Sequence, residues 1–594
     1  MKNCLFFIIA VLSINFSHSQ VVCAGVSPAT IAGNYSFSWG DPANTWGSPD
    51  FNIPGTTITG ELMMVDDGSV GNSPASGLPL AYYGCSPLVN NLTGKIAVVY
   101  RYDGVTASTI CWMSEKALIA QNAGAIGVLF INRPGANADL STGGATSAPS
   151  VTIPAVLIDF NDGALLLAEL LQGNTVTMFF GNKTGLYAND IGVVNTDKLI
   201  SKSMGVSSQL SINNSEFNFE LGTRVFNYGN SNQTNVMVTA NVDGPSGTSV
   251  FNSTVGPISL LAGDTIDVYP GELFSFPQFS LSSYPAGRYK LTYSVTLAIP
   301  DEYPGDNMNA SNFVVNDSII SYSALDPITN LPTSQNFSRP TTNNNTYSNC
   351  MVIKDPNGSR IGVEGIYFSA STSYGSGILL SGEEMALSLY QWDDVFTDLN
   401  DVNLAFNTLN PISLGYYYYP SDLQGETVYG AFSAPVLLED NRRYLACVKT
   451  VNTSLFLGSD TKTNYLWNES YYLQPAFPIE SDGVYAASGF GADSPPAMGV
   501  KIFSAAEAGI TNQNQLNFSV FPNPSENGVT VSLNAEGSVK LTITDISGKK
   551  VLNTSLYFIN NESEINIETL QSGMYIFSIV TETGETSQFN VIKK

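Results

Sequence analysis

The stretch ICWMSEKALIAQNAGAIGVLFIN (residues 110–132) places a lysine-bearing helical pattern, a glycine-rich turn and an apolar run next to one another. Residues 114–122 are predicted to form a helix that Gly124 ends, and residues 126–131 a buried strand. A dinucleotide cradle needs the reverse order, in which a strand is followed by G-x-G-x-x-G and then a helix. Glycines at a helix C-terminus meet the end of the dipole that repels anions. The stretch therefore predicts a capped helix packed beside a strand, and it excludes a nucleotide cradle.

Several motifs lie in order around this stretch. They are Cys85, Gly94-Lys95-Ile96, Arg101, Cys111, Lys116, Ala123-Gly124-Ala125, Asn132, Ile153-Pro154 and Gly163. Together they resemble the protease-associated (PA) domain, over residues 20–190, which implies a β-rich α/β fold. The departure from the family is YDGVTASTI (102–110), inserted ahead of Cys111 in a loop that the family often uses for contacts. The resemblance implies a module that positions or admits protein or peptide partners and has no catalytic residues of its own.

Length and composition indicate an exported chain of several domains. The 594 residues are enough for roughly three to five domains. Apolar residues make up 43% and charged residues only 12%, so neutral polar side chains must cover most of the surface, as in extracellular β-rich modules. The formal net charge of −26, with no offsetting basic stripe, repels phosphate backbones. Nucleic acid is therefore excluded as a partner.

The N-terminus has the pattern of a secretory signal. Lys2 precedes an apolar stretch over residues 5–16, and small residues lead to a predicted cleavage between Ser19 and Gln20. The stretch is shorter than the about 20 apolar residues that cross a bilayer, and no later segment reaches that length. We expect residues 1–19 to be a removed signal peptide and the chain to have no transmembrane segment.

The histidine and cysteine content limits which catalytic and metal sites the chain can form. The only histidine is His18, so the mature chain lacks the imidazole that Ser-His-Asp, Cys-His and His-ligated zinc sites require. Five cysteines remain after signal removal, none in a C-x-x-C pair. We expect two disulfides, each within one domain, with Cys23 left over. The predicted pairs are Cys85 with Cys111 and Cys350 with Cys447.

Two β modules follow. The first, residues 195–318, has V-x-N-x-G at 225–229, G-x-Y at 287–289 and an acidic turn at 301–307. It resembles the CARDB-like bacterial adhesion module, which implies an immunoglobulin-like sandwich. Residues 319–505 show further short alternating strands and are predicted to form a jelly-roll-like β-sandwich. Residues 506–515 are a predicted linker.

Apparent catalytic and metal motifs are incomplete. KTG at 183–185 and S-x-x-K at 459–462 each match a motif of the penicillin-binding proteins. They occur in the wrong order, and the third motif of that family, S-D-N, is absent. The acidic segment QWDDVFTDLNDVN (391–403) holds enough carboxylates for a glycoside hydrolase, but a surface loop is favoured. GYYYYP (415–420) could stack on sugars, although alternating tyrosines more often pack one face of a strand. No cofactor is expected, and structural calcium at Asp-rich turns such as 65–68 is the alternative.

The C-terminal module has its own set of motifs. They are Pro522-Asn523-Pro524, Gly528, Gly573, Tyr575 and the basic end Lys593-Lys594. They resemble the type A sorting domain of the type IX secretion system of Bacteroidota, over residues 516–594. The resemblance implies a small β-sandwich, the type IX machinery as a partner, and passage through the periplasm and outer membrane to the cell surface or medium.

The chain is thus expected to be mainly β and multidomain: a PA domain, two β-sandwiches and the sorting module. The leading hypothesis is a non-enzymatic binding protein whose PA domain contacts a protein or peptide. The alternatives are an extracellular hydrolase that uses carboxylates on glycans or peptides, and an accessory arm of a separate metallopeptidase. The sequence does not identify the ligand.

Overall fold

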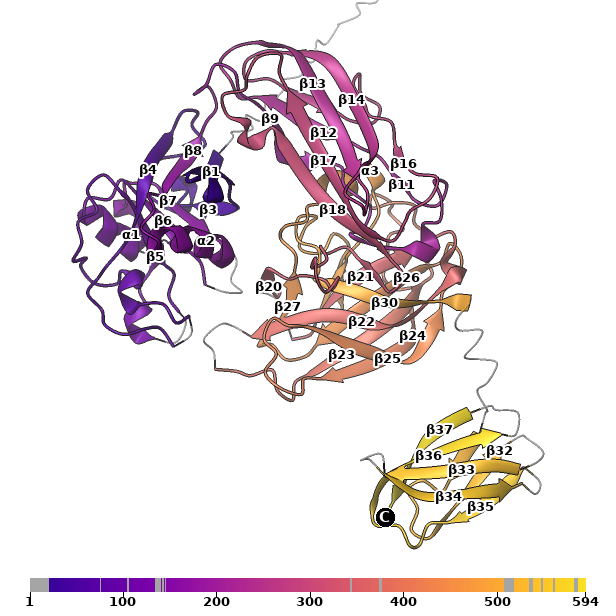
Figure 1. Ribbon diagram of the computed structural model, residues 1–594. Helices are drawn as coiled ribbons and strands as arrows, with labels where there is room; N and C mark the ends of the chain where they lie inside the picture. The colour runs from indigo at the N-terminus through magenta and orange to yellow at the C-terminus, as the bar shows by residue number, and fades with distance from the viewer. Residues whose placement is uncertain are drawn as a thin grey trace, which may run out of the picture. The chain divides into compact units, whose positions relative to one another are not determined.

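The computed structural model describes residues 21–594 except 75, 104–105, 134–139, 141–143, 145, 342–344, 373–376, 507–517, 534–537, 546–548, 559–560 and 582–585. The predicted signal peptide and cleavage site, Ser19 and Gln20, lie outside the described residues, as does the predicted linker except at its first residue, 506. The structure is mainly β, as predicted (Figure 1). Two compact units divide the chain, one with residues up to Gly358 and Val363–Ile502, the other with Ser359–Gly362 and Phe503–Lys594.

The N-terminal module is one sheet of eight strands in the order β2-β1-β8-β4-β5-β6-β7-β3. The bounds are β1 Val21–Ser27, β2 Gly33–Asn34, β3 Phe37–Trp39, β4 Thr57–Met64, β5 Ile96–Tyr100, β6 Gly127–Ile131, β7 Ala155–Ile158 and β8 Thr177–Asn182. Strands β4 to β7 pair in parallel, and the outer strands pair antiparallel. This mixture agrees with the β-rich α/β fold that the PA resemblance implies.

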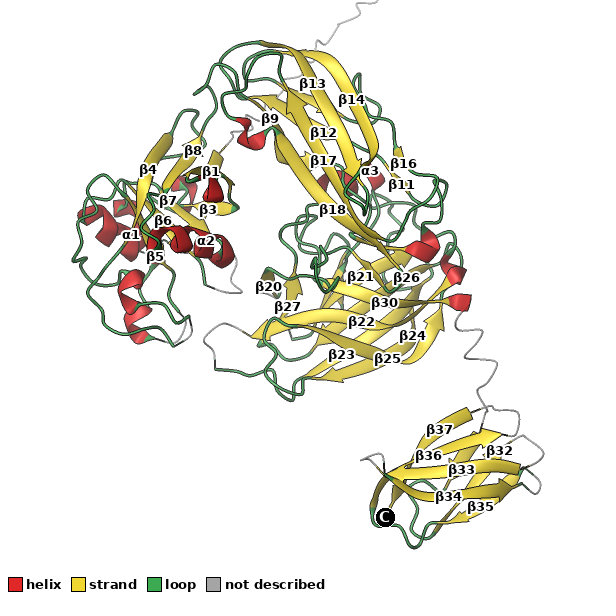
Figure 2. Cartoon of the chain, in the orientation of Figure 1, coloured by secondary structure: helices red, strands yellow, loops and turns green. Residues whose placement is uncertain are grey.

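Two helices cover opposite faces of this sheet, α1 (Met113–Asn122) and α2 (Phe160–Leu171). Alternate residues of a strand point to opposite faces. In β6, Val128 and Phe130 share a core with α1, whereas Leu129 and Ile131 share a core with α2. Figure 2 shows both helices beside these strands. The continuous apolar run GVLFI is thus explained by a strand buried on both sides.

The second module is built from long antiparallel strands. Its bounds are β9 Ile191–Lys198, β10 Gly205–Ser207, β11 Asn218–Phe219, β12 Thr223–Asn227, β13 Gln233–Asp243, β14 Ser249–Leu260, β15 Thr265–Val268, β16 Phe279–Ser280, β17 Gly287–Thr296 and β18 Met308–Asn316. Strands β14, β13, β17 and β18 lie side by side (Figure 1), and β15, β12 and β9 form a separate sheet. Inward-facing aromatic and β-branched residues of these strands form one core.

The third module contains the helix α3, Leu466–Tyr472, and further strands. They are β19 Ile319–Ser321, β20 Asn336–Ser338, β21 Tyr347–Lys354, β22 Ile361–Thr372, β23 Glu384–Trp392, β24 Leu409–Tyr418, β25 Thr427–Leu437, β26 Arg443–Thr450, β27 Leu455–Ser459, β28 Ile479–Ser481, β29 Val484–Ala486 and β30 Met498–Ser504. Strands β24-β23-β26-β21-β28-β29 form one sheet. Strand β10 of the second module pairs with both β18 and β19, so one eleven-stranded sheet runs through both modules.

The C-terminal module has two sheets, β31-β32-β35 and β34-β33-β36-β37. The bounds are β31 Phe518–Phe521, β32 Gly528–Leu533, β33 Ser538–Asp545, β34 Lys550–Tyr557, β35 Glu562–Asn566, β36 Gly573–Thr581 and β37 Thr586–Lys593. Both sheets contribute to one core that includes Val531, Leu541 and Phe577. The module therefore has a core of its own.

Both predicted disulfides are formed. Cys85–Cys111 closes a separation of 26 residues, and Cys350–Cys447 closes 97 residues between facing positions of β21 and β26. Cys23 on β1 is buried and unpaired, and its burial raises the pKa of the thiol. Across the described residues, no helix is both long enough and apolar enough to span a bilayer.

Candidate functional site

The end of the N-terminal module that carries the inserted loop is held together by the Cys85–Cys111 disulfide. The Asp67 carboxylate accepts hydrogen bonds from the backbone N–H groups of Cys85, at 3.0 Å, and Ser86, at 3.4 Å. Exposed apolar side chains lie on the segments joined in this way. They are Val70, Val89, Ile110 and Trp112, which we call the apolar patch. Their fractional exposures run from 55% to 90%.

Beneath this end, Lys116 of α1 is buried. Its Nζ donates to the backbone oxygen of Tyr100, 2.9 Å away, at the end of β5. Burial lowers the pKa of Lys116 to about 7, while the carboxylates of Asp67 and Asp103 act in the opposite direction. Lys116 therefore ties α1 to the sheet and is not a surface ligand group.

Arg101 and Asn132, which the PA resemblance also includes, follow neighbouring strands. Arg101 Nη1 donates to Asn132 Oδ1 at 3.1 Å, so the structure brings the two residues together at the ends of β5 and β6. This hydrogen bond gives them a structural role at the same edge of the sheet.

A cavity of about 330 Å³ lies where α3 meets β21, β26 and the segment before β10. Three cationic side chains line it, Lys202, Lys354 and Arg443, and one carboxylate, that of Glu469. The chain as a whole has a net charge of −26. Because Arg443 is ion-paired with Asp394, the two lysines are the cationic groups that favour an anionic ligand in the cavity.

Each of these charges is constrained by its surroundings. Arg443 is almost fully buried, is ion-paired with Asp394 and lies over the Phe396 ring, with its guanidinium carbon 4.1 Å from the ring centroid. Burial lowers the pKa of Lys202, against the opposing effect of nearby carboxylates. Glu469 accepts a hydrogen bond from Ser488. An anion bound near Lys202 would offset the cost of burying its ammonium group.

Aromatic rings form one wall of the cavity. The centroids of Tyr322, Tyr465 and Phe477 lie 5.8 to 5.9 Å from one another. Tyr465 donates its hydroxyl to the Tyr322 backbone oxygen at 2.8 Å, and Tyr322 donates its hydroxyl to Val352 O at 3.1 Å. The hydroxyls are thus engaged in fixing the rings, and what the wall offers a ligand is ring surface.

The Asn468 side chain helps to anchor helix α3 across the modules. The Asn468 amide donates to Ile200 O at 2.8 Å and accepts from Ile200 N at 3.0 Å. This paired contact fixes Glu469, the next residue of the helix, relative to Lys202. Sequence reasoning missed this site, because its residues come from several separate segments between Lys202 and Ser488 and share no motif.

In the acidic segment 391–403, Asp393 and Asp394 line an open pocket together with Glu439 and Asp440. Asp393 is ion-paired with Arg442 at 2.9 Å, and Asp394 is ion-paired with Arg443. Asp398 and Asp401 accept hydrogen bonds from backbone N–H groups of their own loop. Across the described residues, no group of three or more His, Cys, Asp or Glu side chains is placed to hold a metal ion.

The tyrosine run on β24 alternates between two faces. Tyr416 and Tyr418 are more than half exposed, whereas Tyr419 is buried. Tyr418 donates its hydroxyl to Glu384 on the neighbouring strand at 2.7 Å. The run therefore follows the period of two of a β-strand, in which one face packs against the protein and the other is exposed to solvent.

Two of the predicted sorting residues lie where the first and last strands of the C-terminal module meet. The Asn523 side chain donates to Asn590 O and accepts from Ile592 N, each at 2.8 Å, and the Lys594 backbone N–H donates to Ser525 O at 2.8 Å. Gly528 and Gly573 begin β32 and β36, and Tyr575 donates to Gln571 O. Asn523 and Lys594 thus fasten the Pro-Asn-Pro turn to the chain end.

Comparison with known proteins identifies two parts of the chain. Residues 51–166 match the PA domain family, and residues 519–593 match the secretion system C-terminal sorting domain. A search of curated proteins finds no match.

Solved structures resemble parts of the chain. An aminopeptidase from Aneurinibacillus sp. strain AM-1 is 21% identical, with a TM-score of 0.18, over 28% of this chain and 30% of that one. BSAP, a zinc aminopeptidase from Bacillus subtilis, is 20% identical, with a TM-score of 0.17, over 32% of this chain and 37% of that one. The CARDB domain of the PF1109 protein from Pyrococcus furiosus is 17% identical, with a TM-score of 0.13, over 22% of this chain and 90% of that one. The chain spans about a third of the length of the two aminopeptidases.

The two family matches agree with the two resemblances read from the motifs. The C-terminal match accounts for export through the type IX machinery, past the outer membrane, to the medium or the cell surface. The chain is a secreted protein that carries a PA domain and a C-terminal sorting domain of the type IX secretion system.

Proposed function

We propose that this protein is a non-enzymatic binding protein that holds a carboxylate-bearing segment of an extracellular peptide or glycan. The observation that carries the proposal is the cavity at α3, with three cationic side chains, one carboxylate and an aromatic wall. Cationic groups would bind the carboxylate, and the rings would pack against the apolar face of a side chain or a sugar.

Binding without turnover is favoured by the carboxylates present. A glycoside hydrolase needs two carboxyl groups that flank one bond. Glu469 is the only carboxylate lining the cavity among the described residues, and Asp393 and Asp394 are held in arginine ion pairs. The mature chain also lacks an imidazole to serve as a general base.

The apolar patch is the second surface to which we assign contacts, in this case with a protein. The disulfide and the Asp67 hydrogen bonds fix the segments that bear it, so little conformational entropy would be lost on binding. Trp112 would be its main anchor, since tryptophan contributes disproportionately to binding energy at interfaces.

The test is a screen of the mature protein against acidic peptides and uronic-acid oligosaccharides, with matched neutral analogues, scoring both retention and cleavage. Retention of an acidic probe without cleavage supports the proposal, and the two probe sets separate the peptide from the glycan. Reproducible cleavage, or equal retention of neutral analogues, would overturn it.

Variants locate the binding. Lys354→Glu is expected to weaken the affinity for the retained probe roughly tenfold or more, because it reverses one cavity charge. Lys290→Glu makes the same change at an exposed position of strand β17, outside the cavity, and should leave affinity unchanged. Equal effects of the two variants would place the ligand elsewhere.

A further inference from the structure

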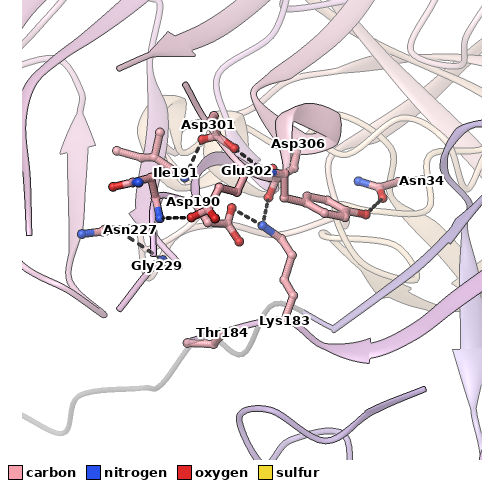
Figure 3. Close-up of polar contacts among 12 residues, drawn as sticks. Asn34, Lys183, Thr184, Asp190, Ile191, Asn227, Gly229, Asp301, Glu302 and Asp306 are labelled. Carbon is pink, nitrogen blue, oxygen red and sulfur yellow. Dashed lines mark hydrogen bonds and ion pairs between the residues drawn. The ribbon is translucent and has the colours of Figure 1, made fainter. Parts of the chain in front are cut away.

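A lysine and two aspartates meet in the interior where the N-terminal module joins the second module (Figure 3). Lys183 follows β8, Asp190 precedes β9, and Asp306 ends the short helix Pro304–Asp306. Lys183 Nζ lies 2.9 Å from Asp306 Oδ2 and contacts Asp190 Oδ1 directly. The side-chain exposures of Lys183, Asp190 and Asp306 are 0%, 0% and 3%. We call these three residues the junction triad.

Aromatic rings separate the triad from water. The Nζ atom lies 4.5 Å from the centroid of the Tyr228 ring and 4.3 Å from that of Tyr303. Tyr303 in turn donates its hydroxyl to Asn34 Oδ1 at 2.8 Å. The amine is therefore held between two ring faces, with two carboxyl groups in contact range.

The backbone around the triad is fixed by further hydrogen bonds. Glu302 Oε2 accepts from the N–H groups of Ala188, at 2.8 Å, and Asn189, at 2.7 Å, and Asp301 Oδ2 accepts from Ile191 N at 2.9 Å. A side chain at Gly192 would place its Cβ 2.4 Å from Asp306 Oδ2, so only glycine admits the carboxyl group there. The reacting groups are thus held in place before any reaction, which favours an intramolecular step.

The junction triad holds two carboxyl groups and one amine, so one carboxyl group is not neutralised by the lysine. Burial raises the pKa of Asp190 to about 7 and that of Asp306 to about 6, with Lys183 opposing and Asp301 adding to both shifts. One carboxyl group therefore retains a proton near neutral pH. Asp190 Oδ2 is buried and has no hydrogen-bond partner among the described residues.

We propose that Lys183 and Asp190 condense to an amide cross-link, with Asp306 as the group that transfers the proton. The Lys183 ammonium first gives one proton to the Asp306 carboxylate, and the resulting amine attacks Cγ of the protonated Asp190 carboxyl, so that the C–N bond forms. Asp306 then donates its proton to the departing hydroxyl and takes a second proton from Nζ, so the C–O bond breaks with release of one water and Asp306 ends protonated. No oxidant or further reactant is consumed.

The product fits the same surroundings better than the ion pair. Amide formation removes one of the two Asp190 oxygens and so lowers the number of buried oxygens that need a partner. The new N–H would still face Asp306 Oδ2, at the 2.9 Å already present, and would donate to it. The buried ammonium also becomes neutral, which removes the cost of holding it away from water.

A second buried lysine provides a comparison within the chain. Lys198 Nζ contacts Asn309 Oδ1, and burial lowers the pKa of Lys198 to about 8. Among the described residues, no carboxylate forms an ion pair with Lys198, so no group there can carry the proton. We expect no cross-link between Lys198 and Asn309.

The test is peptide mapping of the mature chain. With the amide in place, trypsin cannot cut after Lys183, and fragmentation of the peptide that ends at Lys198 should show the mass of one water missing between residues 183 and 190. Mapping is needed beside the intact mass, because an N-terminal Gln20 that cyclises would lose one ammonia. Lys183→Met and Asp306→Asn should both restore the full mass, whereas Lys198→Met should retain the loss.

Peptide mapping tests the proposed cross-link even if a variant fails to fold, because the result for the wild-type chain alone can contradict the proposal. Cleavage after Lys183 with the full mass of both peptides would overturn it. A branched product that joins Lys183 to the peptide containing Asp306 would overturn the assignment of Asp190 as the bonded residue. An unchanged water loss in folded Asp306→Asn would rule out proton transfer by Asp306.

Discussion

Lys116 illustrates how a single buried amine makes stability depend on pH. In the folded chain its pKa is lowered to about 7, against 10.5 when unperturbed. Between these values the unfolded chain binds more protons, so the contribution of Lys116 to the unfolding free energy rises with pH over that window and is constant below it. Urea denaturation at pH 7 to 10 should therefore show a steeper rise with pH for wild type than for Lys116→Met. Parallel curves would contradict the assigned shift.

Single residues were predictable where their partners lie in the same module. The Cys85–Cys111 and Cys350–Cys447 pairs followed from sequence because each joins two cysteines of one domain. Lys183 was visible only as part of a chance KTG match, since its partner Asp306 lies 123 residues away in the chain. No local pattern records such a contact, and the same limit hid Lys202 and Arg443.

The two disulfides are predicted to stabilise the fold by different amounts. In the chain-entropy model the stabilisation grows with the loop closed, to roughly 3.5 kcal/mol for 26 residues and roughly 4.7 kcal/mol for 97. The double variant Cys350→Ala/Cys447→Ala should therefore lose about 1 kcal/mol more unfolding free energy than Cys85→Ala/Cys111→Ala. Denaturant titration of both variants measures the difference. A larger loss for the shorter loop would show that native strain or cavity formation dominates instead.

Helix α2 depends on a close approach at Gly163. A Cβ built there would lie 2.2 Å from Ile131 Cγ2 on β6, although the position is helical. Gly163→Ala should therefore destabilise the module by about 1 to 3 kcal/mol despite the better helix propensity of alanine. Asn161→Ala, at an exposed position of the same helix, is the control and should change stability little. Thermal unfolding of both variants checks the prediction, and a stabilised Gly163→Ala would contradict it.

Element identity could be predicted from sequence better than element pairing. The predicted helix 114–122 and strand 126–131 correspond to α1, Met113–Asn122, and β6, Gly127–Ile131, because Gly124 at a φ of 92° gives an unambiguous helix end. The eleven-stranded sheet could not be predicted. It depends on Gly205 pairing with Val314 on one side and with Ser321 on the other, across more than 100 residues.

At the scale of the whole molecule, export should be separable from folding. The sorting module has its own core, and residues up to Gly358 with Val363–Ile502 form a separate compact unit. Deletion of residues 516–594 should therefore leave the upstream modules folded, with both disulfides formed. The shortened chain should still cross the inner membrane, since its predicted signal is intact, and should accumulate in the periplasm because the type IX sorting domain is gone.

Cell fractionation with immunoblotting measures this outcome, and non-reducing peptide mapping of the periplasmic product verifies that the upstream modules have folded. A matched control replaces only the exposed Lys540 of β33 with glutamate, which leaves the Pro-Asn-Pro turn and the chain end in place and should not alter export. Equal amounts of the shortened and full chains in the medium would mean that residues 516–594 are not the export signal. The turn fastened by Asn523 to the last strand would then be only a closure of the sandwich.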